Sequence, residues 1–264
     1  LDKDGKPLDA GPFVVSAAAD CQQRPQVAFG DGVFLVTWHD LRNGKDWDVY
    51  AARVTPQGKT LDADGNPVAG GEDNQCEPAL CFDGEAFQLV YRKWNQRGGY
   101  DIYGSRVAPD GQLLDGEGAF LADPKSLPAG LRRISMGTPG VGPAPGSGLV
   151  AGARMRSQLW LWRMKDGQRD GDFAAVSGRK HNGRPRFATD GKDLLVVWTT
   201  LMIAGGRSTG ETDSGMLLLD GGSLASICQP VSLATSTLPR RPSASPSRWR
   251  SATSASGEAM SAKW

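Results

Sequence analysis

The sequence predicts an all-β protein built from repeated four-stranded units, and three observations lead to this prediction. One segment occurs twice in nearly the same form, apolar and polar residues alternate as they do in strands, and Gly, Asn, Asp and Pro stand between the alternating runs. The composition agrees: 35 Gly and 17 Pro among 264 residues, with 39% hydrophobic residues, suit short strands joined by tight turns. No stretch shows a convincing helical period.

The repeat is clearest between residues 34–68 and 87–121, which align without a gap. The shift is 53 residues throughout, and it relates Phe34 to Phe87, Asp48 to Asp101, Tyr50 to Tyr103, Arg53 to Arg106, Val54 to Val107 and Gly58 to Gly111. An ungapped match of this length indicates a structural repeat, which has to be identified before any motif is interpreted.

Further copies are more degraded. The opening pieces RPQVAFGDG (24–32) and EPALCFDG (77–84) return as RPRFATDG (184–191), and RRPS (240–243) begins another copy. Residues 146–168 fill the place of a third unit, with Arg163 and Gly167 roughly where Arg53 and Gly58 belong. The first residues, LDKDGKPL, match the end of a unit, LDADGNPV at 61–68.

Each unit reads as four strands. In the first unit we expect strands at 26–29, 33–40 and 47–54, followed by a turn and a short outer strand within 59–68. Units of this size cannot cover their own apolar faces and are stabilised by packing against neighbours in a ring. The prediction is a five-bladed β-propeller of four-stranded blades, about 53 residues per repeat, whose N-terminal strand pairs with the C-terminal blade and closes the ring.

The predicted domain is a single propeller, 1–264. Its parts are a closing strand (1–17), blade 1 (18–71), blade 2 (72–126), blade 3 (127–179), blade 4 (180–236) and an incomplete or aberrant blade 5 (237–264). The last part departs from the pattern, because twelve of residues 240–264 are Ser or Ala and none is Val, Ile, Leu or Phe. It is either a segment in a shifted reading frame from about Ser243 or a disordered Ser-rich tail.

Three motifs carry a family resemblance. They are Trp38-Asp40-Arg42, then Asp48-Val49-Tyr50-Arg53-Val54, then Gly58-Leu61-Asp62, and the second unit keeps the last two as Asp101-Ile102-Tyr103-Arg106-Val107 and Gly111-Leu114-Asp115. The pattern resembles that of secreted bacterial repeat proteins, frequent in myxobacteria. The resemblance implies an exported propeller and no particular common activity.

Composition excludes several classes of function. Lys+Arg 30 against Asp+Glu 29 gives no reason to expect nucleic acid as a partner, and the apolar runs are too short for membrane insertion. The four cysteines lack metal-type spacing, which leaves one or two disulfides or buried free thiols, and we expect neither a metal nor a cofactor. The chain starts at Leu1 without a leader, so we expect a processed product that is secreted or at the cell surface.

The cluster Trp38, His39, Asp40 and Arg42 has the residue types of an acid/base site. The second unit has Tyr91, Arg92, Lys93 and Asn95 at these positions, so the repeat favours structural roles, with Trp38 between blades and Asp40 paired with Arg53. We therefore predict no catalytic residue.

The loops between second and third strands are the better candidates for function. They span 40–47, 93–100 and 199–214, and share a rim with the loops between blades. Their aromatic and polar side chains suit sugar stacking or protein anchoring, and the predicted ligand-binding residues are Arg42, Trp47, Trp94, Asn95, Arg97 and Tyr100.

The resulting prediction is an extracellular binding or adhesion module, lectin-like, that recognises carbohydrate or a cell-surface protein. The alternative is a glycoside hydrolase-type enzyme with carboxylates in the central funnel, which five acids could supply: Asp40, Asp46, Asp48, Glu85 and Asp190. The sequence specifies neither the ligand nor the oligomeric state.

Overall fold

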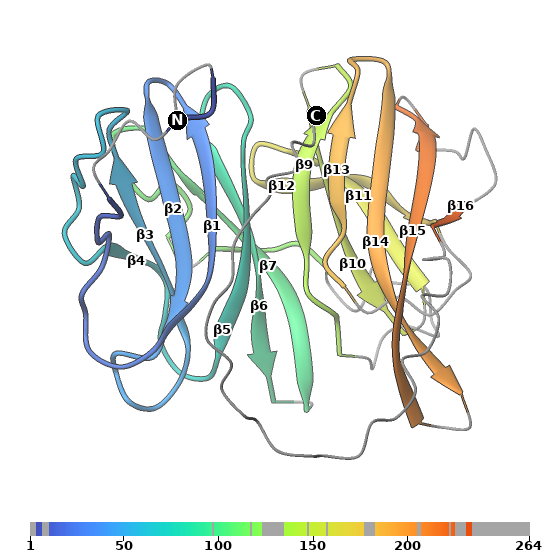
Figure 1. The fold of residues 1–264 in the computed structure, drawn as a ribbon, viewed down its shortest axis with the longest axis horizontal. Coiled ribbons are helices and arrows are strands. Elements are labelled where there is room, and N and C mark those ends of the chain that lie inside the picture. The colour runs from blue at the N-terminus through green and yellow to red at the C-terminus, as the bar shows by residue number, and fades with distance from the viewer. Residues whose placement is uncertain are drawn as a thin grey trace, which may run out of the picture. The chain divides into compact units, whose positions relative to one another are not determined.

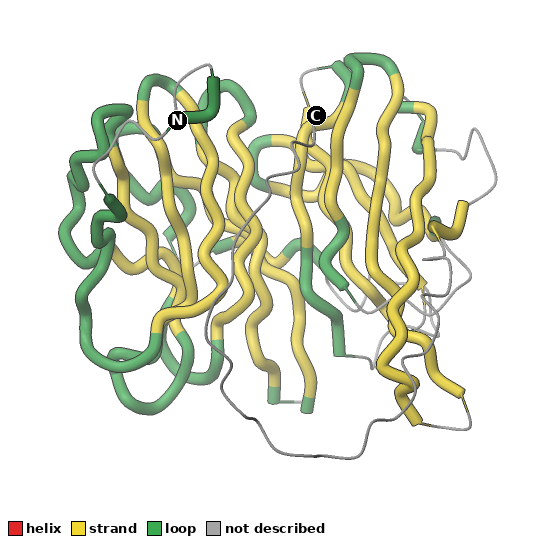
Figure 2. Tube along the Cα trace, viewed as in Figure 1, coloured by secondary structure: helices red, strands yellow, loops and turns green. Residues whose placement is uncertain are grey.

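The computed structural model describes residues 4–6, 11–122 except 97 and 117, 135–176 except 147 and 157, 183–221 except 205 and 206, 223–224 and 231–233. Throughout this part of the chain the regular structure is strand, without a helix (Figure 2). Accordingly, no described helix is long and apolar enough to cross a membrane.

The described strands form four antiparallel sheets of four strands each, and within every sheet the strands follow one another in chain order (Figure 1). The first sheet contains β1 (Gln22–Gly30), β2 (Val33–Asp40), β3 (Asp48–Val54) and β4 (Asn66–Ala69). The second contains β5 (Gln75–Phe82), β6 (Phe87–Asn95), β7 (Gly99–Val107) and β8 (Ala119–Phe120).

The other two sheets repeat this order. The third contains β9 (Gly140–Ala144), β10 (Gly148–Met155), β11 (Gln158–Lys165) and β12 (Gln168–Ala175). The fourth contains β13 (Arg186–Thr189), β14 (Asp193–Ala204), β15 (Arg207–Asp220) and β16 (Val231–Leu233). The prediction of a rim loop over 199–214 is therefore wrong for most of this range. β14 and β15 continue through it and pair from Thr199↔Ser214 to Ala204↔Arg207.

The hairpins of the first two sheets have the same register. Trp38 lies opposite Tyr50, and Tyr91 lies opposite Tyr103. The β1–β2 turn has its two central residues, Asp31 and Gly32, at φ 46° and 76°. Positive φ at both positions is the geometry that two-residue hairpin loops require, so the predicted Gly-Asp-Gly turn follows from local chemistry.

A repeated ion pair explains two of the sequence motifs. Arg53 donates from Nε and Nη2 to Asp62, both at 2.8 Å, and Arg106 holds Asp115 through the same two nitrogens. Each arginine also reaches the next unit: Arg53 donates to the backbone oxygen of Asp110, and Arg106 lies against Gly167. The predicted pair of Asp40 with Arg53 is wrong, because these residues lie at opposite ends of the β2–β3 hairpin.

Apolar side chains fill the space between successive sheets in three clusters. One joins the first and second sheets around Leu35 and Phe87, one joins the second and third around Ile102 and Trp162, and one joins the third and fourth around Leu161 and Leu219. The first strands of the sheets, β1, β5, β9 and β13, contact one another in succession (Figure 1). We call these four the inner strands.

The all-β prediction and the four-stranded antiparallel units are confirmed, while five blades and ring closure stay predictions. Residues 237–264, with the aberrant tail, lie outside the described residues, as do 1–3 and 7–10 of the proposed closing strand. The described residues 11–17 form no strand. Cys21, Cys76 and Cys81 are free thiols, and Cys228 lies outside the described residues.

Candidate functional site

A cavity of about 370 Å³ lies where the inner strands begin, and it is lined by residues of β1, β5 and β13 and of the segments that lead into β9 and β13. Gln22 at the start of β1 pairs with Asp40 at the end of β2, so the inner strands begin at the same end as the β2–β3 loop. We call it the central cavity. It is lined by Arg24, Gln26, Glu77, Thr138, Gly183, Arg184 and Arg186.

Each sheet, or the segment that leads into it, places one residue that precedes a proline in this cavity: Arg24 and Glu77 in β1 and β5, and Thr138 and Arg184 just before β9 and β13. Arg24 and Glu77 have φ of 57° and 55°, and each lies at a bulge in its inner strand. A residue before proline favours extended conformations, and a non-glycine residue held outside them costs roughly 1–3 kcal/mol. Bulges re-aim side chains next to functional sites, and here they direct Arg24 and Glu77 to the cavity.

The carboxylate of Glu77 is held by two neighbouring sheets. Oε2 accepts a hydrogen bond at 2.6 Å from Nη1 of Arg92 and another from the hydroxyl of Thr138. The side chain is 18% exposed. Burial alone would raise the pKa of Glu77, but the Thr138 and Arg92 hydrogen bonds outweigh it and lower that pKa below its usual value. Glu77 is therefore ionised at neutral pH.

Three guanidinium groups share the cavity with this carboxylate. Arg184 donates from Nη2 to the backbone oxygen of Glu77 at 3.2 Å, and Arg186 donates to Gln26 of β1 at 3.1 Å. Nη1 of Arg184 is buried and has no hydrogen-bond partner among the described residues. Burial, and then repulsion from Arg186, lower the pKa of Arg184 to about 10, which leaves it protonated at neutral pH.

His39 lies behind Glu77 as a neutral imidazole. Its Nδ1 accepts a hydrogen bond from the backbone nitrogen of Glu77 at 3.2 Å, which places the ring proton on Nε2. Burial lowers the pKa of His39 to about 4. In the second sheet the repeat puts Arg92 at the position of His39, and this is the residue that binds the Glu77 carboxylate.

The predicted rim aromatics lie behind the cavity and contact residues of this chain. The ring of Trp47 stacks on His39 at 4.3 Å. Trp94 meets Tyr100 edge-on at 5.0 Å, and the guanidinium of Arg92 lies 3.8 Å from the centre of the Tyr100 ring. These side chains therefore support the two residues that contact Glu77, and none of the three lines the cavity.

The other predicted ligand-binding residues are also engaged internally or cannot be placed. Arg42 donates to Asp40 at 2.6 Å and to the Asp64 backbone oxygen at 2.7 Å, with its guanidinium over Tyr50. Asn95 accepts a hydrogen bond from the backbone of Gly99 at 3.2 Å. Arg97 lies outside the described residues.

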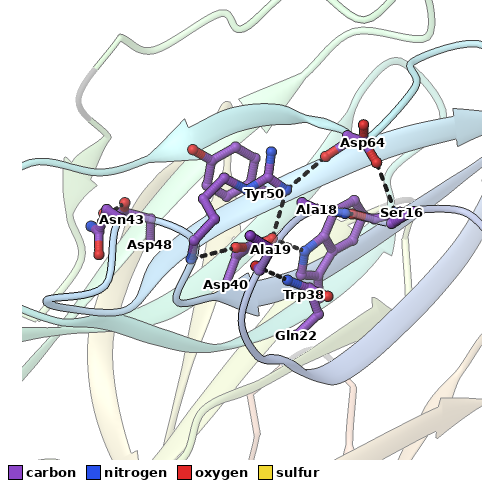
Figure 3. A network of polar contacts seen from close by, with 12 residues as sticks. Ser16, Ala18, Ala19, Gln22, Trp38, Asp40, Asn43, Asp48, Tyr50 and Asp64 are labelled. Carbon is purple, nitrogen blue, oxygen red and sulfur yellow. Dashed lines mark hydrogen bonds and ion pairs between the residues drawn. The ribbon is translucent and has the colours of Figure 1, made fainter.

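The Trp-x-Asp-x-Arg motif forms a structural network in the first sheet, shown in Figure 3. Asp40, fully buried, accepts hydrogen bonds from the Trp38 indole at 2.8 Å and from the side chain and backbone of Arg42. Although burial raises the pKa of Asp40, these bonds lower it overall. Asp64 extends the network by accepting from the backbone of Ala17 at 2.7 Å. In this geometry Asp40 binds Trp38 and Arg42 instead of the predicted Arg53, and both Trp38 and Asp40 have structural roles within the first sheet.

None of the five acids considered for a central funnel lines the cavity, which contains Glu77 as its carboxylate among the described residues. Asp40 and Asp48 are buried within the first sheet, Asp190 lies in the β13–β14 turn, and Glu85 lines a separate cavity between the second and third sheets. The feature of the sequence that could have identified the cavity residues is the X-Pro dipeptide near the start of each unit, because the residue before each proline lines the cavity. Within the described part of the chain, no group of three or more His, Cys, Asp and Glu is arranged to hold a metal ion.

No protein-family model matches the sequence, and no curated protein matches it. Solved structures do match. GH43B of the Bacteroides ovatus xyloglucan PUL has a TM-score of 0.50 at 11% identity, over 80% of this chain and 41% of its own. A glycosyl hydrolase from Bacteroides ovatus has a TM-score of 0.50 at 10% identity, over 78% and 70%.

An endo-arabinase from Bacteroides thetaiotaomicron has a TM-score of 0.47 at 12% identity, over 80% of this chain and 81% of its own. This chain spans less than two thirds of the GH43B protein, and likeness at such identity shows the fold alone.

The prediction of a lectin-like or adhesion module is corrected by these findings. The two matched structures with a TM-score of 0.50 are GH43B and a glycosyl hydrolase, and neither is a lectin or an adhesion module. The rim aromatics, which carried the prediction, pack on His39, Arg92 and each other. The sequence showed their residue types and their place on the loops, whereas their partners depend on how neighbouring sheets pack.

Proposed function

We propose that this protein is a glycoside hydrolase-type enzyme whose glycan substrate binds in the central cavity. The observation that carries the proposal is Glu77, an ionised carboxylate held in a left-handed bulge at the end of the sheets where the inner strands begin. Its cavity is at the small end of the roughly 300–1,000 Å³ range of ligand sites. The hydrolases of similar fold support the assignment.

The geometry suits Glu77 to one of the two carboxyl roles in glycoside hydrolysis. One group protonates the leaving oxygen, and the other acts ionised, as a base toward water or as a nucleophile at the sugar carbon. Because Arg92 and Thr138 lower the pKa of Glu77, it is suited to the ionised role. Both hydrogen bonds described above reach Oε2, so we assign Oε1 to the reacting water or sugar.

The residues around Glu77 keep it in place. His39 fixes the backbone nitrogen and Arg92 the carboxylate, while Trp47 and Tyr100 pack behind these two. Such support from rigid strands is what an active site needs, because small displacements of a reacting group are costly in rate. We include export in the proposal, on the basis of the repeat motifs that resemble secreted proteins.

The test is a substrate screen with the Glu77→Gln variant. The wild type is assayed on arabino-, xylo-, galacto- and galacturono-oligosaccharides, and hydrolysis is followed by chromatography of the products. We expect turnover of at least one glycan and a loss of about 100-fold or more in kcat for Glu77→Gln, since the amide neither accepts a proton nor attacks.

Glu85→Gln is the matched control, because Glu85 is an exposed acid that lines the other cavity. It should retain wild-type turnover. Absence of hydrolysis across the panel, or hydrolysis that survives Glu77→Gln unchanged, would contradict the proposal.

A further inference from the structure

We infer that the central cavity selects a glycan that bears an anionic group, a carboxylate such as that of a uronic acid, and that Arg24, Arg184 and Arg186 bind this group. The inference rests on the proposed function for the sugar part of the ligand. The anionic part follows from the charge and geometry of the cavity itself.

The charges of the cavity are unbalanced. Three arginines and one glutamate line it, and that glutamate is already paired with Arg92, which lies outside the lining set. The chain as a whole has a net charge of only +1, so this excess is local. A concave site lined by one sign of charge concentrates ligands of the opposite sign.

Arg184 supplies the sharpest evidence, because half of its guanidinium fork has no partner. Nη2 donates to the backbone of Glu77, while Nη1 is buried without a hydrogen bond among the described residues. A buried polar group left unpaired is destabilising, and more so when it is charged. Arg184 lines the cavity, so a ligand carboxylate bound there would add a counter-charge beside this guanidinium.

The backbone also supports a ligand role for Arg24. Arg24 is exposed and held at φ 57° before Pro25, in a bulge that turns it to the cavity. The positive charge of Arg24 acts on the Glu77 carboxylate, but among the described residues the Arg24 side chain forms no ion pair or hydrogen bond. Backbone strain of this kind clusters at ligand-binding and active sites, which is consistent with a ligand role for Arg24.

Guanidinium chemistry defines the class of ligand. A planar fork of N–H donors matches the two oxygens of a carboxylate, and a sulfate ester offers related geometry. A neutral sugar could use these donors only as single hydrogen bonds and would leave the cations without a counter-charge. We therefore assign the carboxylate-bearing sugar, and a sulfated sugar forms a comparison arm of the test.

The test is calorimetric titration of the full chain that carries Glu77→Gln, in which turnover is blocked. The ligands are trigalacturonate, its methyl ester, in which the same sugars are uncharged, and a sulfated galactose trisaccharide. We expect trigalacturonate to bind at least about tenfold more tightly than the ester, with an affinity that falls as salt is raised.

Arginine variants locate the binding. Adding Arg184→Gln or Arg24→Gln should weaken trigalacturonate binding by about tenfold or more, since each removes charged hydrogen bonds. Arg24 is exposed, so its variant tests the inference even if Arg184→Gln fails to fold. Lys192→Gln, an exposed residue in the β13–β14 turn, removes the same charge at the other end of the sheet and should change nothing.

The outcomes separate this inference from the proposed function. Equal binding of trigalacturonate and its ester, tighter binding of the sulfated sugar, or arginine variants that bind as the parent does, would overturn the inference and leave Glu77-dependent hydrolysis standing. Selective binding of trigalacturonate through the arginines, without hydrolysis by the wild type, would uphold the inference and overturn the proposed function.

Discussion

The first and second sheets are two copies of one sequence unit, and they differ where they face the central cavity. Their structural positions agree closely. Arg53 and Arg106 hold Asp62 and Asp115 in the same way, and the aromatic pairs Trp38 with Tyr50 and Tyr91 with Tyr103 occupy the same register. These contacts are made within the unit or to its neighbour, so each copy needs them.

At the cavity the same two copies carry different chemistry. Arg24 in the first corresponds to Glu77 in the second, and neutral His39 corresponds to the cation Arg92. Both Arg24 and Glu77 keep the unusual backbone conformation although their charges are opposite. The bulge thus belongs to the repeat and the side chain on it belongs to the site, a distinction that single substitutions can test.

The largest expected effect concerns burial, at Phe87 and its counterpart Phe34. Phe87 is 0% exposed between two sheets, whereas Phe34 is 36% exposed. We expect Phe87→Ala to lower the free energy of unfolding by about 3–5 kcal/mol and Phe34→Ala by about 1 kcal/mol. Urea denaturation of both variants measures this. Equal losses would show that the two faces are equally covered in solution.

A smaller effect is expected at the ion pairs that the two copies share. Asp62→Asn and Asp115→Asn should each cost about 1–2 kcal/mol in unfolding free energy at pH 7, because each weakens charged hydrogen bonds to a partly buried arginine. A loss in only one copy would break the equivalence of the units.

The Asp62 pair also predicts a pH dependence. The Arg53 hydrogen bond lowers the folded-state pKa of Asp62. Its stabilisation is therefore present above the unfolded pKa of about 4 and is lost as pH falls through the lowered folded value. Urea denaturation at pH 7 should show the wild type to be more stable than Asp62→Asn, and at pH 2 the unfolding free energies of the two proteins should converge. A difference in unfolding free energy between the two proteins that is the same at both pH values would contradict the pairing of Asp62 with Arg53 as its cause.

Much of the fold was predictable because its determinants are local. The strand at 33–40 and the Asp31-Gly32 turn follow from alternation and from backbone preference. β1 begins at Gln22, earlier than the predicted 26, because Gln22 and Gln23 pair with Asp40 and His39 beyond the bulge. Such an extension depends on the partner strand, which periodicity does not show.

The site was less predictable, because its residues come together only through the packing of different sheets. Glu77 receives Arg92 from its own sheet, Thr138 from the approach to the third and Arg184 from the approach to the fourth. Trp47 and Tyr100 have the residue types of a binding surface, but His39 and Arg92 occupy their faces. Residue type and loop position therefore predicted the correct end of the sheets for the candidate site, but they selected side chains that do not line the cavity.

The central claim is that the strained residues before proline serve a ligand in the central cavity. The most direct test measures both the unfolding free energy and the trigalacturonate affinity of the Arg24→Gly variant. If the strained residues before proline serve a ligand, glycine at φ 57° should raise the free energy of unfolding by about 0.5–1 kcal/mol. It should also weaken trigalacturonate binding about tenfold or more. The matched Glu77→Gly should destabilise instead, because it leaves Arg92 without its carboxylate. An Arg24→Gly protein that is less stable than wild type, or that binds trigalacturonate as tightly, would contradict the account.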